Sequence, residues 1–264
     1  MAAWSGWTVD GSTLYSMEGA KIGLMFCVET ENAGAPRDMD IMDRFYRKFG
    51  FEGEIIRQPS KEFMLRSLQN LANYSPKPVS CILIAFSGHG DEKVGEWNES
   101  ELVTADHQRV KVSSITSIFS ETNCPRLKGV PKIFITDACR GRIHEFGVMH
   151  GSGKIQGLRA KNERDEEYLR KYRTSYRSAV INDMFAAYAA TPGNPAYMDE
   201  LTGGYLFFCI ERVFLDHSTV GIHFMDLFIR VKQCFEKINS STCVDLPLLT
   251  MNMESTFSHL LYLG

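Results

Sequence analysis

The fold of this chain is decided by Ser80-Cys-Ile-Leu-Ile-Ala-Phe-Ser-Gly-His-Gly90 and Lys132-Ile-Phe-Ile-Thr-Asp-Ala-Cys-Arg-Gly141. Each stretch opens with an apolar run of strand length, and a run that is apolar on both faces predicts a central strand covered on both sides. Each run ends in a turn that contains glycine, with His89 in the first turn and Cys139 in the second. Sites in open α/β sheets lie at the carboxyl ends of the strands, so we expect both side chains at one edge of the sheet.

The sequence around these two runs alternates between strand and helix patterns. Apolar residues at helical spacing end near Gly50, and Ser60 is a suitable N-cap for a further helix. This alternation predicts an α/β sandwich with a mostly parallel central sheet flanked by helices. The predicted strands are 22–28, 54–58, 80–86, 132–136, 184–190, 246–253 and 257–263, and the predicted helices are those ending at Gly50 and beginning after Ser60, with 205–216 and 224–237.

The composition is that of an ordinary globular protein. The 264 residues are 44% hydrophobic and 23% charged, which excludes intrinsic disorder, a coiled coil and a collagen-like fibre. The net charge of −3 gives no reason to expect a nucleic-acid partner. The seven cysteines are widely spaced and form no CxxC motif, so we expect neither a disulfide framework nor a zinc site. We also expect no cofactor.

The sequence also contains no apolar stretch of membrane-spanning length. The first 20 residues lack the basic and apolar regions of a signal peptide. We therefore expect a soluble, cytoplasmic protein with no membrane partner.

A cysteine and a histidine at one sheet edge favour nucleophilic catalysis. The thiolate is the reactive form of cysteine, so a nucleophile such as Cys139 needs a nearby imidazole, here His89, to take its proton. Glycines beside both residues leave backbone N–H groups free to stabilise the oxyanion of an acyl-transfer intermediate.

The motif Ala138-Cys-Arg-Gly141, with a histidine about 50 residues upstream, resembles the caspase signature. Asn123-Cys-Pro-Arg-Leu-Lys-Gly-Val-Pro-Lys-Ile-Phe134 resembles the segment that leads into the caspase catalytic strand. Asp183-Met-Phe-Ala-Ala-Tyr-Ala-Ala-Thr-Pro-Gly193 resembles the first strand of a caspase small subunit. The resemblance covers roughly residues 18–264 in the same order, and it implies a caspase-like sandwich.

This resemblance also implies a division of the chain. The polar, Gly- and Ser-containing residues 1–17 predict an N-terminal arm, and the resemblance makes 18–264 the peptidase domain. Within that domain, 18–147 would be large-subunit-like, 148–181 the intersubunit linker and 182–264 small-subunit-like. A protein organised in this way would be an apoptotic zymogen that acts on protein substrates.

The same resemblance assigns roles to three residues. Cys139 would be the nucleophile and His89 the general acid and base. The backbone N–H groups of Gly90 and Cys139 would form the oxyanion hole.

Acidic residues set this chain apart from caspases. Asp137 stands where caspases carry Gln, two residues before the cysteine. The loop Asn194-Pro-Ala-Tyr-Met-Asp-Glu200 has no Arg or Lys where caspases place one pocket arginine, and Asp38 occupies the helix-start position of the other. The walls of the S1 pocket would thus be formed by Asp137, Asp38 (or Asp40) and Asp199 (or Glu200).

A carboxylate cluster in a narrow pocket repels a substrate Asp and attracts Arg or Lys. In having Asp two residues before the cysteine, this chain resembles paracaspases and metacaspases, which prefer a basic residue at P1. Ser87-Gly-His-Gly90 is likewise similar to their histidine motif. The sequence therefore predicts cleavage after Arg, and less readily after Lys.

The sequence leaves three alternatives open. One is an Asp-specific caspase in which Arg37 supplies the pocket charge, although Asp137 would oppose a substrate Asp. Another is a catalytically idle regulator that dimerises with a related protease, although the Cys–His pair is intact. The third is a flavodoxin-like nucleotide binder, for which Glu29-Thr-Glu-Asn-Ala-Gly34 is too acidic to cradle a phosphate.

Two further segments carry predictions. The linker contains five candidate sites for an Arg-directed self-cleavage but only Asp165 for an Asp-directed one. The strand Leu248-Leu-Thr-Met-Asn-Met253 occupies the position through which caspases pair with a second copy, which predicts a homodimer. The candidate linker sites are Arg159, Arg164, Arg170, Arg173 and Arg177.

Overall fold

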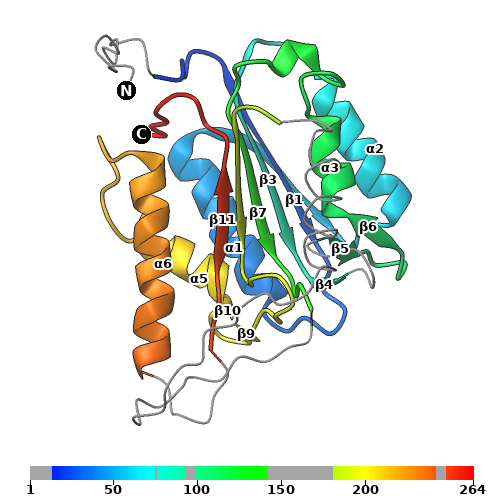
Figure 1. Ribbon diagram of the computed structural model, residues 1–264, viewed down its shortest axis with the longest axis vertical. Coiled ribbons are helices and arrows are strands. Elements are labelled where there is room, and N and C mark those ends of the chain that lie inside the picture. The colour runs from blue at the N-terminus through cyan, green and yellow to red at the C-terminus, as the bar shows by residue number, and fades with distance from the viewer. Residues whose placement is uncertain (1–13, 75, 93–98, 142–180, 242–247) are drawn as a thin grey trace, which may run out of the picture.

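The apolar runs of the sequence form the strands of one six-stranded sheet in the order β11-β8-β7-β3-β1-β2. This computed structural model describes residues 14–74, 76–92, 99–141, 181–241 and 248–264 (Figure 1). All neighbouring strands run parallel except β11, which is antiparallel to β8, so the predicted α/β sandwich with a mostly parallel sheet is confirmed. The strands are β1 (Ala20–Cys27), β2 (Phe51–Arg57), β3 (Val79–Ser87), β7 (Lys132–Asp137), β8 (Met184–Tyr188) and β11 (Asn252–Ser255).

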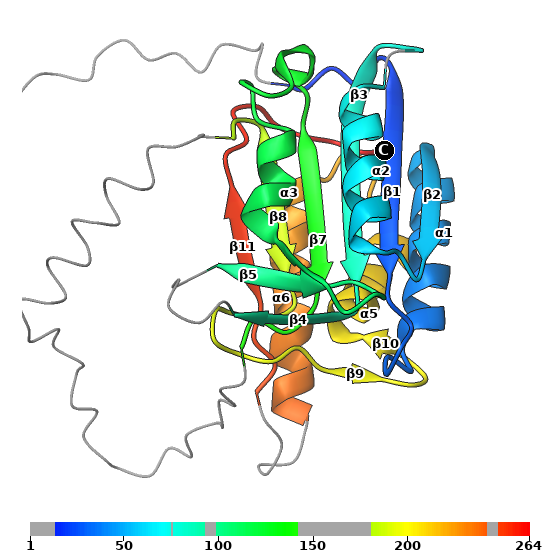
Figure 2. The same cartoon turned by 90° about the vertical axis from the view of Figure 1, so that its right-hand side faces the viewer.

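Helices cover both faces of the sheet (Figure 2). Successive side chains of a strand point to opposite faces, so Met25 and Cys27 of β1 join one core while Leu24 and Phe26 join the other. The first core lies under α1 (Ala35–Phe49), α5 (Tyr205–Ile210) and α6 (Phe224–Ser241), and the second lies under α2 (Lys61–Ala72) and α3 (Val112–Ile118).

Local signals set the ends of the first two helices. Gly50 ends α1 in the left-handed conformation, with φ of 69°, which glycine adopts without a steric penalty. The hydroxyl oxygen of Ser60 accepts a hydrogen bond from the backbone N–H of Phe63, which confirms Ser60 as the N-cap of α2.

Two small sheets lie at the carboxyl ends of the main strands, and the sequence patterns did not predict them (Figure 1). Their strands have two to four residues, too few to show a hydrophobic period. One sheet consists of β4 (His89–Glu92), β5 (Ser100–Val103) and β6 (Arg109–Lys111), and the other of β9 (Met198–Asp199) and β10 (Gly203–Gly204).

The predicted helix 205–216 is not uniform. After α5 the chain continues as a π-helical turn, η2 (Glu211–Leu215), in which the N–H of Asp216 bonds the carbonyl of Glu211. Such widened turns often occur at functional sites.

The prediction for the C-terminal segment was partly wrong. The strand predicted at 246–253 is instead β11, Asn252–Ser255, and residues 246–247 lie outside the described residues. No strand forms at 257–263, where Leu260 makes only an isolated bridge to Leu14. Groups outside the sheet provide hydrogen bonds to this backbone. The carbonyl oxygen of Leu261 accepts one from the N–H of Phe224, and the carbonyl oxygen of Leu263 accepts one from Nζ of Lys21.

Residues 1–13 and 142–180 lie outside the described part of the chain, so most of the predicted arm and linker are not described. The end of the arm is anchored, since Tyr15 is buried and its hydroxyl donates to Asp183 at 2.7 Å. Among the described residues, none of the helices combines the length and apolar character that a membrane span requires.

Candidate active site

The two glycine-containing turns leave neighbouring strands at the same level. Ser87 and Asp137 are register partners at the ends of β3 and β7, and the N–H of Gly88 donates to the carbonyl of Asp137. A Cβ added to Gly90 would lie 2.4 Å from the carbonyl oxygen of Cys139. Only glycine permits this approach, and the turns of His89 and Cys139 therefore lie side by side, as the sequence predicted.

His89 opens β4 and faces the loop that follows β1. Its Nε2 atom lies 2.6 Å from the carbonyl oxygen of Thr30. A carbonyl oxygen only accepts hydrogen bonds, so this contact places a proton on Nε2 and leaves Nδ1 of a neutral ring as the acceptor. Thr30 therefore orients the imidazole, a role that the sequence patterns did not indicate.

Cys139 is half-buried, and its thiol donates to the carbonyl oxygen of Ala196 at 3.7 Å. Burial raises the pKa of this thiol, and the charges of Asp137 and Asp91 act in the same direction. Within the described residues, His89 and Cys139 each bond a backbone carbonyl and do not bond one another. The thiol and the imidazole, on neighbouring turns, are therefore each held by a backbone carbonyl group.

The turn after Cys139 is held in place by Arg140. Its backbone exchanges hydrogen bonds with Gly193 and Asn194 of the facing loop. Its buried guanidinium donates to Ser100 Oγ at 2.7 Å and stacks on the ring of Tyr188, 4.2 Å from the ring centroid. The sequence placed Arg140 inside a motif but did not reveal these three anchors.

The structure brings Asp38 and Asp137 together beside this turn. Both are nearly inaccessible, with exposures of 1% and 6%. Asp38 accepts hydrogen bonds from the hydroxyl of Ser87 at 2.6 Å and from the N–H of Gly204 at 2.8 Å. Asp137 accepts from the N–H of Leu206 at 3.2 Å. A Cβ on Gly204 would collide with the Asp137 carboxylate and one on Gly203 with that of Asp38, so the two glycines make room for both acids.

Burial sets the protonation of this pair. Desolvation raises the pKa of Asp38 to about 6. It raises the pKa of Asp137 well above the usual range, and the neighbouring Asp38 charge raises it further. Two desolvated carboxyl groups so arranged would be stabilised in their ionised form by a bound cation.

The third predicted acidic residue lies differently. Asp199 is exposed, and its carboxylate accepts hydrogen bonds from the N–H groups of Leu201 and Thr202 in its own turn. Its backbone pairs with Gly203, which brings Asp199 close to the loop that contacts Asp38. Its alternative, Glu200, is exposed on the same turn.

Comparison with known proteins identifies the family. A family model described as "Caspase domain" matches residues 22–257. The chain belongs to the caspase family. The caspase domain is that of a cysteine-type peptidase, so the resemblance deduced from the sequence motifs is confirmed.

Relatives of this caspase-family chain include Caspase-14 of Mus musculus, 31% identical over 137 residues that cover 50% of this chain and 50% of the relative. Caspase-6 of Rattus norvegicus is 29% identical over 238 residues, covering 88% and 79% of the two chains. The crystal structure of Caspase-1 from Spodoptera frugiperda superposes with a TM-score of 0.75 at 18% identity, covering 96% of each chain, and supports the fold. The matches to Caspase-14 of mouse and human span about half of those proteins.

The acidities of two thiols predict an order of modification. A hydrogen bond with Cys209 lowers the pKa of Cys234 to about 7, with Lys237 acting in the same direction, whereas burial raises that of Cys139. Alkylation proceeds through the thiolate. Near neutral pH, iodoacetamide should therefore label Cys234 before Cys139, as followed by peptide mass spectrometry. Labelling of Cys139 should keep accelerating above pH 9, because its pKa is raised from 9.0.

The control for this experiment is Cys234→Ser, which should leave the labelling rate of Cys139 unchanged. Faster labelling of Cys139 than of Cys234 in the wild-type protein would contradict the assigned acidities.

Proposed function

We propose that this caspase-family protein is a cysteine endopeptidase that cleaves protein substrates after Arg and, less readily, after Lys. The observation that carries the proposal is the pair of buried carboxyl groups, Asp38 and Asp137, directly beside the turn that bears Cys139. A guanidinium binds carboxylates bidentately through its planar fork, whereas an ammonium acts as a point charge, and this favours Arg over Lys.

The proposed chemistry uses Cys139 and His89 as a dyad. Nδ1 of His89 accepts the thiol proton, and the resulting thiolate attacks the substrate carbonyl carbon. The N–H groups of Gly90 and Cys139 stabilise the oxyanion, and the imidazolium returns the proton to the leaving amine. Water then hydrolyses the thioester with His89 as the base. The bond between His89 Nε2 and Thr30 supports this scheme because it leaves Nδ1 as the basic atom.

In the proposed S1 pocket, Asp137 is the principal partner of the P1 guanidinium and Asp38 supports it. Asp199 joins them only if its side chain leaves the turn that it now caps. The rival assignment, an Asp-directed pocket with Arg37 as its cation, is not favoured. The guanidinium of Arg37 bonds Glu211 and Asp40 instead of entering the space around Asp137.

We also propose that the enzyme processes its own linker, residues 148–181, nearly all of which lies outside the described residues. The five linker arginines match an acidic S1 pocket, whereas an Asp-directed enzyme would find only Asp165.

Replacement of the nucleophile tests the proposed activity. Cys139→Ala should abolish cleavage of a peptide with Arg at P1 and leave the linker intact, because no thiolate can form. His89→Ala should lose nearly as much activity, because the effects of replacing residues that act as one catalytic unit are not additive. Mass spectrometry of the active wild-type protein should show new C-termini at one or more linker arginines. Turnover by Cys139→Ala, or a cut after Asp165, would refute the proposal.

Neutralising the pocket tests its specificity. Asp137→Asn should reduce kcat/KM for a P1 Arg peptide by more than about tenfold, because truncating one partner of a buried charge pair costs about 2–5 kcal/mol. In the wild type, the same rate should fall as the pH drops through about 6, where Asp38 takes up a proton. Asp43→Asn, on the solvent face of α1, is the matched control and should change neither quantity. A P1 Asp peptide that outperforms its Arg counterpart would overturn the acidic-pocket assignment.

The stability of the folded protein should depend on pH in the opposite direction to the activity, and decrease as the pH rises. A carboxyl group whose pKa is raised by folding opposes folding once the pH exceeds its ordinary pKa, which is 3.8 for an aspartate. Wild-type stability should therefore decline between about pH 4 and pH 6, and Asp137→Asn should be at least as stable as the wild type near neutral pH. Urea unfolding at several pH values measures both. A large loss of stability in Asp137→Asn would contradict the raised pKa of this residue.

We further propose that the protein acts as a homodimer. Strand β11 ends the sheet order, and among the described residues only β8 pairs with it. The predicted pairing segment, Leu248–Met253, overlaps β11 in its last two residues. An open sheet edge is a site for strand pairing, and a twofold contact closes the assembly.

Sedimentation velocity should show a dimer, at the latest after a covalent inhibitor has reacted with Cys139. Cys139→Ala, which cannot react, is the control for the inhibitor-induced shift. A protein that remains monomeric in both states would refute the dimer proposal.

A further inference from the structure

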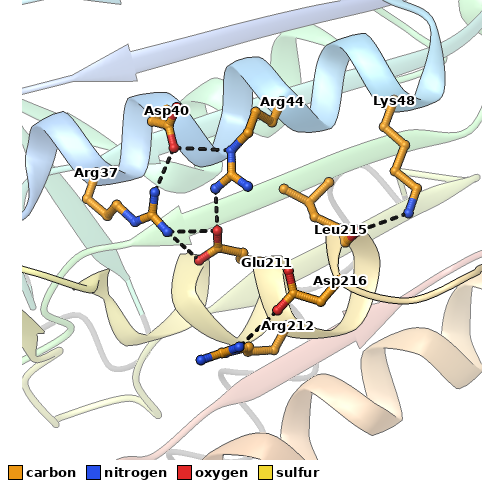
Figure 3. Close-up of polar contacts among 8 residues, drawn as sticks. All are labelled: Arg37, Asp40, Arg44, Lys48, Glu211, Arg212, Leu215 and Asp216. Atoms are coloured by element: carbon orange, nitrogen blue, oxygen red, sulfur yellow. Dashed lines mark hydrogen bonds and ion pairs between the residues drawn. The ribbon is translucent and has the colours of Figure 1, made fainter.

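Four charged side chains form a closed network between α1 and η2 (Figure 3). Arg37 donates to both oxygens of Glu211, at 2.8 and 2.9 Å, and to Asp40 at 2.7 Å. Arg44 donates to the same two acidic residues. The network therefore contains two cations and two anions, and its charges balance.

Glu211 is the buried member of this network. Its side chain is 9% exposed, whereas those of Arg37 and Asp40 are 36% and 48% exposed. It is the first residue of the π-helical turn, and it receives bonds from both arginines of α1. A buried carboxylate with two guanidinium partners holds them much more firmly than an exposed one does.

Arg37 is the immediate neighbour of Asp38, yet the two side chains diverge. Both approach Gly203, where an added Cβ would lie 2.3 Å from the Asp38 carboxylate and 3.3 Å from Cβ and Cγ of Arg37. From that point Asp38 turns to Ser87 and the N–H of Gly204, whereas Arg37 turns to Glu211. The stem of Arg37 thus lies beside Asp38, whereas its charge is held by Glu211 and Asp40.

We propose that Glu211 is a positioning residue that determines specificity, because it withholds Arg37 from Asp38 and Asp137 and so keeps the P1 pocket acidic. This inference rests on the proposed function, since it concerns the same pocket. Without the Glu211 carboxylate, two guanidinium groups share the exposed Asp40, and one positive charge is left uncompensated next to Asp38. That charge competes with a P1 Arg and attracts a P1 Asp.

The test compares Glu211→Gln, Arg37→Gln and the double variant. Glu211→Gln should lower the ratio of kcat/KM for P1 Arg over P1 Asp peptides by about tenfold or more, the effect of one unit charge at close range in a partly buried site. The double variant should restore the wild-type ratio, because the released cation is gone. Arg37→Gln alone should retain the wild-type ratio, since Arg44 still neutralises Glu211.

The double variant separates this role from a structural one. If Glu211 merely held η2 against α1, removal of Arg37 would not restore the ratio, and the inference would be overturned. An unchanged ratio in Glu211→Gln would overturn it as well.

A second measurement does not depend on turnover. Titration of the Asp38 carboxyl carbon by NMR should give a lower pKa in Glu211→Gln than in the wild type, and Arg37→Gln in that background should reverse the shift. The groups that face Asp38 in the wild type are Asp137, the Cys27 thiol, the Ser87 hydroxyl and the Gly204 N–H. Identical titration in all variants would overturn the inference. If the wild-type protein cleaves no P1 Arg peptide, the proposed function fails, whereas the titration still tests the position of Arg37.

Discussion

The pairing of β3 with β7 as far as Ser87 and Asp137 is the contact on which the site depends. These strands end at one level, so the turns that follow carry His89 and Cys139 out of the sheet side by side. The same register places the Ser87 hydroxyl where it can donate to Asp38. A shift of one residue would turn the strand's side chains to the opposite face and would separate the thiol from the imidazole.

Around that edge, the site is built from groups that are costly to bury. Asp38 and Asp137 are desolvated next to one another, and only backbone N–H groups and one hydroxyl compensate them in the described structure. Protonation relieves part of the cost, which is why their pKa values are raised. In the proposed S1 pocket, a bound guanidinium would supply the positive charge that these two carboxyl groups lack. Under that proposal, stability and specificity oppose one another at these two positions.

The helical layer distributes charge as well as covering the sheet. Helix α1 carries both acidic and basic residues, and Glu211 of η2 bonds Arg37 and Arg44, which also bond Asp40 (Figure 3). The π-helical turn belongs to this arrangement, because Glu211 is its first residue. Under our proposal, this contact between α1 and η2 influences the electrostatics of the P1 pocket without lining it.

Periodicity and turn chemistry act over a few residues, so the sequence by itself determined the parallel strands, the Ser60 cap and the common sheet edge of His89 and Cys139. The family motifs carried the identity of the domain for the same reason. Contacts between distant segments follow no local pattern. Only the tertiary structure decided that Thr30 orients His89 and that Glu211 bonds Arg37, 174 positions away in the chain. It also decided that residues 257–263 bond Lys21 and the first residue of α6 instead of forming a strand. Those partners meet because helix packing and strand register bring them together, and neither the packing nor the register can be read from the local sequence pattern.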